Sequence, residues 1–258
     1  MPTWSPIVLF AVILGLLGLH LASAAARAWV WKALAALGLL LMASGGYLAL
    51  VVAPADREMG DVSRIMYAHV PEVWSALVAL CVNFAASLAY LFRKSLALDA
   101  VAEACAEVGV FFGAVGVLLG SIWGRPTWGV WWDWDPRLTT AAIMLVVYAG
   151  YLALRKFVDD PEKRATFSSV LGIIAFADLP ILWFSVRWWR SLHQRQSGAG
   201  SMDPTIRTVL LWNVAAFLAL TIVFIWHRYQ IAMAARAREV ALPSALPPEP
   251  GAQPTEAA

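Results

Sequence analysis

Residues 101–154 read VAEACAEVGVFFGAVGVLLGSIWGRPTWGVWWDWDPRLTTAAIMLVVYAGYLAL, and this stretch decides the fold. Two apolar runs, 101–122 and 138–154, flank a short segment rich in tryptophan, glycine and proline. A helix needs about 20 mainly apolar residues to cross the hydrocarbon core of a bilayer. The stretch therefore predicts two membrane-spanning helices joined by a tight, aromatic connection.

The same pattern continues along the rest of the chain. Of its 258 residues, 61% are hydrophobic and 14% are charged, and the mean hydropathy is +0.69. A soluble domain carries about 25% charged residues. We therefore predict an all-α polytopic membrane protein with a membrane domain at 1–238 and six core spans at about 30–52, 73–92, 101–122, 138–154, 167–186 and 206–226.

Both ends of the chain lie outside these six spans. The apolar run 7–26 could be a signal peptide, because small residues follow it, but no positive charge precedes it. We therefore expect an additional N-terminal helix there. Residues 239–258 contain five prolines and few large apolar side chains, so we expect a disordered cytoplasmic tail.

The positions of lysine and arginine give the expected orientation. All four lysines, and 11 of the 19 basic residues, fall at the ends of the spans that share a side with Arg93 and the C-terminus. Positive charge is enriched in cytoplasmic loops. We expect this side to be cytoplasmic and the tryptophan-rich segment to face the periplasm. The eight arginines on that outer side could bind a ligand carboxylate or pair with nearby acidic residues.

Several classes of function find no motif in the sequence. It has neither a P-loop nor a dinucleotide-binding glycine pattern, so we expect no ATPase activity of its own and no enzyme. Cys81 and Cys105 form neither a CxxC nor a CxxCH motif, which argues against a redox dithiol and against covalently attached c-type haem. We also expect no nucleic-acid partner.

The tryptophan-rich segment holds five of the 14 tryptophans within residues 123–134. Tryptophan is common at the lipid headgroup level, so an aromatic belt is one interpretation. The alternative is a platform, bent at Gly124, Pro126 and Gly129, on which a large planar ligand stacks. Asp135 and Arg137 would be polar groups beside it. A porphyrin has the flat apolar faces and the carboxylates that this arrangement would bind.

Two histidines are placed to complete such a site. His69 and His193 are expected in outer loops, just before the second core span and just after the fifth. Two imidazoles can hold a haem iron without any covalent bond to the porphyrin. Each histidine taken alone could equally have a structural role. Asp178 is an intramembrane carboxyl and hence a functional candidate, with Asn83 or Asn213 as possible partners or with the acid protonated.

The sequence resembles a known family in three segments, 53–74, 123–139 and 178–194. They are similar to the WWD tryptophan-rich, haem-handling family of cytochrome c assembly, and most of all to haem exporter protein C (CcmC). The resemblance covers residues 30–230. It implies that His69 and His193 are axial ligands of a transient, non-covalent haem b, and that the remaining haem-binding residues are Trp123, Gly124, Trp128, Gly129, Trp131, Trp132, Trp134, Asp135 and Arg137.

The resemblance also implies partners and a location. A protein of this family presents haem at the outer face of the bacterial inner membrane to the haem chaperone CcmE, and works with the ATP-binding cassette pair CcmA and CcmB and with CcmD. Asp133 and Pro136 depart from the family pattern and leave the pose of the aromatic residues open. The alternative function is a membrane-bound b-type cytochrome that carries electrons. Its haem ligands would be expected within spans, and it would keep its haem.

Overall fold

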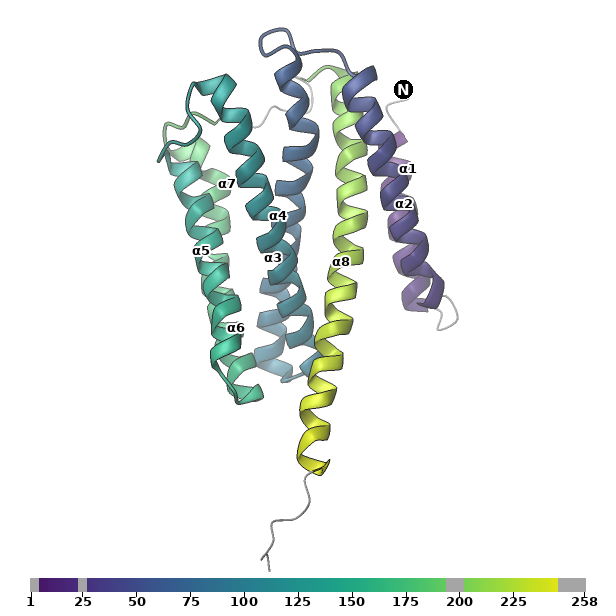
Figure 1. Ribbon diagram of the computed structural model, residues 1–258, viewed down its shortest axis with the longest axis vertical. Coiled ribbons are helices and arrows are strands. Elements are labelled where there is room, and N and C mark those ends of the chain that lie inside the picture. Colours follow the sequence, from purple (N-terminus) through teal and green to yellow (C-terminus); the bar gives the residue numbers. More distant parts are fainter. Residues whose placement is uncertain (1–4, 23–26, 194–201, 246–258) are drawn as a thin grey trace, which may run out of the picture.

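The computed structural model describes residues 5–22, 27–193 and 202–245, and within them the chain forms a bundle of α-helices without strands (Figure 1). The helices are α1 (Ser5–Ala22), α2 (Arg27–Tyr47), α3 (Met66–Arg93), α4 (Leu96–Trp128), α5 (Pro136–Phe157), α6 (Pro161–Phe176), α7 (Asp178–Trp188) and α8 (Pro204–Ala245). A π-helical turn, Leu48–Val52, extends α2, and a 3-10 turn, Asp61–Ile65, precedes α3.

Six helical segments of the described chain are long and apolar enough to cross a membrane, and α1 is a shorter apolar helix. This confirms the predicted six-span core with an additional N-terminal helix. The helices exceed the apolar runs that predicted them, because helix continues into the polar ends of each span. Helix α8 continues to Ala245, into the segment 239–258 that we expected to be disordered. Residues 246–258 and 23–26 lie outside the described residues.

Local sequence explains where the helices begin and end near the tryptophan-rich segment. Helix α4 ends at Gly129, whose φ of 80° is left-handed and favours glycine. Helix α5 begins with Pro136 directly after Asp135, whose side chain accepts a hydrogen bond from the Leu138 amide. The fifth span is divided into α6 and α7, since Pro180 cannot donate the backbone hydrogen bond that would continue the helix.

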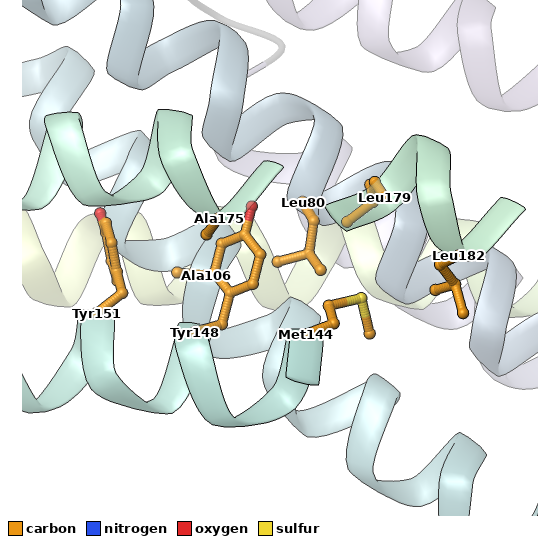
Figure 2. Close-up of a cluster of buried hydrophobic side chains, with 8 residues drawn as sticks. All are labelled: Leu80, Ala106, Met144, Tyr148, Tyr151, Ala175, Leu179 and Leu182. Carbon is orange, nitrogen blue, oxygen red and sulfur yellow. The ribbon is translucent and has the colours of Figure 1, made fainter. Parts of the chain in front are cut away.

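The helices pack in two groups around the central pair α3 and α4 (Figure 1). Helices α1 and α2 pack with α8 on one side, and α5, α6 and α7 lie on the other. Figure 2 shows the apolar cluster that joins the second group to the centre, with residues from α3, α4, α5, α6 and α7. We call the end of the bundle where α4 ends and α5 begins the pocket end.

The opposite end, which we call the ion-pair end, is closed by buried charges. Arg155 of α5 donates two hydrogen bonds to Asp99 of α4, at 2.8 and 2.9 Å. Arg236 of α8 also binds Asp99, and it binds Glu103 at 2.7 Å. The side chains of Arg155 and Asp99 are only 4% and 3% exposed. These pairs tie α4, α5 and α8 together below the apolar core.

Candidate functional site

One cavity opens at the pocket end, between α3, α4, α5, α7 and the segment after α7. Its empty space, counted out to and including the open mouth, is about 1060 Å³. Most of the residues predicted to bind haem line it: His69, His193, Trp123, Gly124, Trp128, Trp131, Trp132 and Arg137. Gly129, Trp134 and Asp135 do not.

His69 lies in the first turns of α3, so the expectation that it belongs to a loop is wrong. Helix α3 begins at Met66, whereas the apolar run that predicted the span begins at residue 73. The Nδ1 atom of His69 lies 2.9 Å from the carbonyl oxygen of Gly116 on α4. A carbonyl only accepts, so Nδ1 carries the proton and Nε2 is left as the metal-binding nitrogen. The ring meets Trp123 edge-on, at 5.8 Å between centroids.

Glycines of α4 make the room for this histidine. A Cβ atom on Gly120 would lie 3.0 Å from Cε1 of His69, and one on Gly116 would lie 3.0 Å from Val73 Cγ2. These two belong to a stripe with Gly113 and Gly124, all four of which line the cavity. Sequence reasoning missed the stripe, although its spacing of three and four residues is that of one helix face.

The tryptophan-rich segment has a different shape from the one that its sequence predicts. Helix α4 continues through Pro126 to Trp128, so neither Gly124 nor Pro126 turns the chain there. Trp123 and Trp128 therefore reach the cavity from a helix, and Trp131 and Trp132 reach it from the connection to α5. The rings form walls around a space and not one flat platform.

Trp134 is the exception among the five tryptophans. It is 72% exposed and meets Trp132 edge-on, at 5.5 Å between ring centroids. Its indole stands outside the cavity, at the surface of the pocket end. A direct role in holding a ligand inside the cavity does not follow from this position.

His193 follows the end of α7, and its ring centroid lies 6.1 Å from that of Trp128. Its backbone amide donates to Ser191 Oγ at 3.0 Å, and this hydroxyl donates in turn to Oδ2 of Asp135. The Leu192 amide donates to the same oxygen at 2.9 Å. Asp135 thus anchors the segment that carries His193.

The other carboxylate oxygen of Asp135 caps α5, accepting from the Leu138 amide at 2.8 Å. The side chain is buried, and both of its oxygens bind groups of the protein. These hydrogen bonds give Asp135 a positioning role within the fold. One carboxylate fixes both the start of α5 and the segment of His193.

Donors for a ligand's carboxylates come instead from Arg137 and Trp123. Arg137 lines the cavity, and one of its NH groups donates to the Leu182 carbonyl at 3.2 Å, which leaves further N–H groups on the same guanidinium. The buried indole Nε1 of Trp123 has no hydrogen-bond partner in the part of the chain that the structure describes. A buried donor of this kind is costly unless it is paired. Both groups are suited to an anionic ligand.

Met59 also lines the cavity and was not foreseen. It is presented by a turn in which Asp56 Oδ1 accepts from the amides of Glu58 and Met59, each at 2.9 Å, and in which Gly60 has a φ of 56°. These two amide hydrogen bonds hold the pKa of the Asp56 carboxyl below its usual range.

Asp178 does not have the partners that we expected for it. Asn83 donates to the Ala102 carbonyl at 2.7 Å, and Asn213 donates to the Val209 carbonyl at 2.9 Å. Among the described residues, the buried Asp178 Oδ2 atom has no hydrogen-bond partner.

The donor set in the cavity fits a haem better than a bare metal ion. No group of three or more His, Cys, Asp or Glu side chains that could hold a metal ion occurs in the part of the chain that the structure describes. Two imidazoles, apolar walls and a guanidinium instead match the iron, the faces and the propionates of a porphyrin.

Comparison with known proteins also indicates similarity to haem-handling proteins. The family model described as "Heme exporter protein C" matches residues 6–242. The chain is 39% identical over 199 residues to the "Heme exporter protein C" of Bradyrhizobium diazoefficiens, which covers 76% of this chain and 74% of that protein.

More distant relatives match over a similar length. The protein of the same name from Escherichia coli K12 is 35% identical over 195 residues, covering 75% of this chain and 79% of its own length. A "Putative cytochrome c biosynthesis ccmC-like mitochondrial protein" of Arabidopsis thaliana is 35% identical over 186 residues, covering 71% and 70% of the two chains.

Proposed function

The chain belongs to the haem exporter protein C (CcmC) family, which supports a role in haem export for cytochrome c biogenesis, and from this premise we propose that it holds haem b in the cavity at its pocket end. In this proposal His69 and His193 are the axial ligands of the iron. The haem is bound without a covalent bond to the protein, and it is the protein's cargo.

The main observation behind the proposal is that two histidines far apart in the sequence meet at one cavity. His69 and His193 are 124 residues apart in sequence, yet both line one cavity together with four tryptophans. A structural histidine has no need of a shared open space. The Nδ1 hydrogen bond of His69 to Gly116 supports its part, because metal-binding histidines commonly donate their other ring N–H to a carbonyl or carboxylate.

Other residues of the cavity take separate parts in holding the cargo. Trp123, Trp128, Trp131 and Trp132 provide apolar walls against the porphyrin faces and edges. Arg137 and the Trp123 indole N–H bind the propionates. Asp135 acts indirectly, through the segment that carries His193.

The finer biological setting is also proposed. The pocket end faces the periplasm from the bacterial inner membrane, with the C-terminus in the cytoplasm, as the basic residues suggest. There the protein presents haem to the chaperone CcmE, and CcmA, CcmB and CcmD are its partners. The chain itself supplies binding and release, and the sequence offers no ATPase motif for an energy-consuming step.

The first experiment is an optical spectrum of the purified protein, oxidised and reduced, with the haem content measured. We would compare the wild type with His69→Ala and His193→Ala, and use His227→Ala as a control outside the cavity. The expected result is a low-spin bis-imidazole spectrum that either cavity substitution weakens or abolishes, and that the control leaves unchanged. Full haem content with an unchanged spectrum in both cavity variants would contradict the ligand assignment.

A transfer assay then separates export from electron transport. Haem-loaded protein is mixed with CcmE that lacks haem, and the haem on each protein is measured after separation. We expect haem to move to the chaperone. Haem that stays in place through repeated oxidation and reduction would favour the b-type cytochrome instead.

A further inference from the structure

Between the cavity and the ion-pair end, a set of polar side chains is buried among α3, α5 and α6. We call it the polar core cluster, and its members are Asn83, Ser87, Tyr148, Tyr151, Ser168 and Ser169. Each is at most 1% exposed. They occupy the interior of three predicted membrane spans, where neither bulk water nor lipid headgroups can reach them.

Three members of the cluster, Asn83, Ser87 and Tyr151, meet at Gly172 of α6. A Cβ atom at that glycine would lie 3.0 Å from Asn83 Oδ1, 3.0 Å from Ser87 Oγ and 3.3 Å from a ring carbon of Tyr151. The rings of Tyr148 and Tyr151 are 6.3 Å apart between centroids. Figure 2 shows both rings extending from α5, with the Tyr148 hydroxyl directed toward Ala175 of α6.

Most of the hydrogen-bonding capacity of the cluster is not used by the protein. The amide NH₂ group of Asn83 donates to the Ala102 carbonyl at 2.7 Å. The hydroxyls of Tyr148, Ser87, Ser168 and Ser169 have no hydrogen-bond partner among the described residues. The Tyr151 hydroxyl and Asn83 Oδ1 make no hydrogen bond of good geometry either, although the two side chains are close enough to interact. Native proteins leave few such groups, because each buried and unpaired polar atom costs free energy.

We propose that the polar core cluster is a hydration site, in which ordered water molecules join the hydroxyls of Tyr148 and Tyr151 to Asn83 and the serines. The chemistry selects water, because the cluster combines neutral donors and acceptors and carries no formal charge. An apolar ligand would leave every polar atom unpaired. A buried water makes about three hydrogen bonds to groups of this kind.

The site has a charged neighbour on one side and an apolar layer on the other. Toward the ion-pair end, the guanidinium of Arg155 lies over the Tyr151 ring, 5.8 Å from its centroid. Toward the cavity, Met144 and Leu182 belong to both the cavity lining and the apolar cluster of Figure 2. These two apolar side chains therefore lie between the proposed hydration site and the cavity.

Radiolytic footprinting in ¹⁸O-labelled water tests the proposal on the intact protein in detergent. Hydroxyl radicals formed from a bound water oxidise the side chains next to it. We expect several-fold more ¹⁸O in Tyr148 and Tyr151 than in two controls outside the cluster, Tyr90 and Phe112, which are 2% and 5% exposed. Labelling of the two cluster tyrosines no higher than that of the controls overturns the proposal.

Tyrosine-to-phenylalanine substitutions give an independent test with opposite signs for a hydrated and a dry cluster. Removing a hydroxyl that binds water loses hydrogen bonds, so Tyr148→Phe and Tyr151→Phe should each lower the thermal midpoint by about 2–4 °C. Removing an unpaired hydroxyl relieves a desolvated group and leaves the midpoint unchanged or raises it. Such an outcome in both variants overturns the proposal whatever the footprinting result.

Discussion

At the pocket end, His69, Trp123 and Arg137 line a shared space, whereas at the ion-pair end the polar atoms of Asp99, Arg155 and Arg236 bind one another. Both regions bury polar side chains between the same helices, α4 and α5 among them. They differ in what satisfies those side chains. The charges of the ion-pair end pair with one another, whereas at the cavity His69 and Arg137 each donate to a backbone carbonyl and the Trp123 indole N–H has no hydrogen-bond partner among the described residues.

The two ends of this helical bundle are expected to contribute differently, the ion-pair end to stability and the pocket end to binding. A buried charge whose partner is removed costs about 3–5 kcal/mol, so a closed ion-pair network makes the fold sensitive to each member. A cavity whose polar groups face a ligand contributes less to the fold and more to recognition. Substitutions at the two ends should therefore separate stability from haem affinity.

The largest effect is expected from breaking the ion-pair end. Arg155→Met removes two hydrogen bonds to Asp99 and leaves that buried carboxylate with Arg236 alone. The free energy of unfolding should fall by about 3 kcal/mol, while the haem content of the protein that remains folded stays at the wild-type level. Denaturant unfolding followed by circular dichroism, with haem measured on the folded fraction, checks both.

The exposed pair Arg164–Glu239 offers a matched control, because Glu239 is 42% exposed. Arg164→Met should cost less than about 1 kcal/mol. If Arg155→Met instead emptied the folded protein of haem, the two ends would not be independent.

The second effect is expected at the glycine stripe. In Gly120→Ala the new methyl group would press on Cε1 of His69, which lies 3.0 Å away. Disturbing the orientation of a metal ligand typically costs about 10–100-fold in affinity, so we expect haem affinity to fall at least about tenfold. Gly150→Ala is the control, since nothing lies within 4 Å of the added methyl group. Haem titration of both variants should show a loss in the first only.

A smaller effect on haem affinity is expected from a substitution at Arg137. Lysine keeps the charge but lacks the planar fork that binds a carboxylate with two N–H groups, so Arg137→Lys should weaken haem binding about five- to tenfold. Wild type and variant should bind haem dimethyl ester equally, because its propionates carry no charge. A variant that loses affinity for both compounds to the same extent would show that Arg137 acts through packing alone.

The smallest effect is expected at the turn that presents Met59. Asp56→Ala removes the acceptor of two amide hydrogen bonds, and haem affinity should change by less than about threefold, because Asp56 itself does not line the cavity. The folded pKa of Asp56 lies below its ordinary value of 3.8. Its stabilising contribution is therefore present above that pH and lost as the pH falls through the folded pKa. Unfolding of wild type and variant should differ at pH 7 and converge in strong acid; an equal difference at both would contradict this role.

Hydropathy was sufficient to predict the spans, because the cost of polar groups in lipid leaves a strong signal in the sequence. Eight of the predicted site residues line the cavity, because histidine is rare in this chain and tryptophan is concentrated in one short segment. The secondary structure that carries these residues was not predicted. His69 and Trp128 are helical because helix continues past the apolar runs, and hydropathy does not mark where it stops.

Long-range contacts were the second gap. Arg155 and Arg236 entered the sequence analysis only as charges that favour a cytoplasmic side, whereas the structure pairs both with Asp99. Likewise Asp135 was interpreted as a ligand group, and its hydrogen bonds to residues 191 and 192 bind it to the protein instead. Contacts between distant helices depend on packing, which one sequence does not reveal.

The hydrogen bond between Asp135 and Ser191 also bears on the order in which the molecule assembles. It joins residues 56 positions apart, and α5, α6 and α7 lie in the loop that it closes. Contacts across long loops form after the local helices, since the chain entropy of closure must first be overcome. During synthesis, the segment of His193 can be anchored only after those three helices have emerged and packed. A nascent chain would carry His69 and the five tryptophans of residues 123–134 before the segment of His193 is anchored. Under the proposed function, haem binding by both histidines would therefore wait until the bundle is complete.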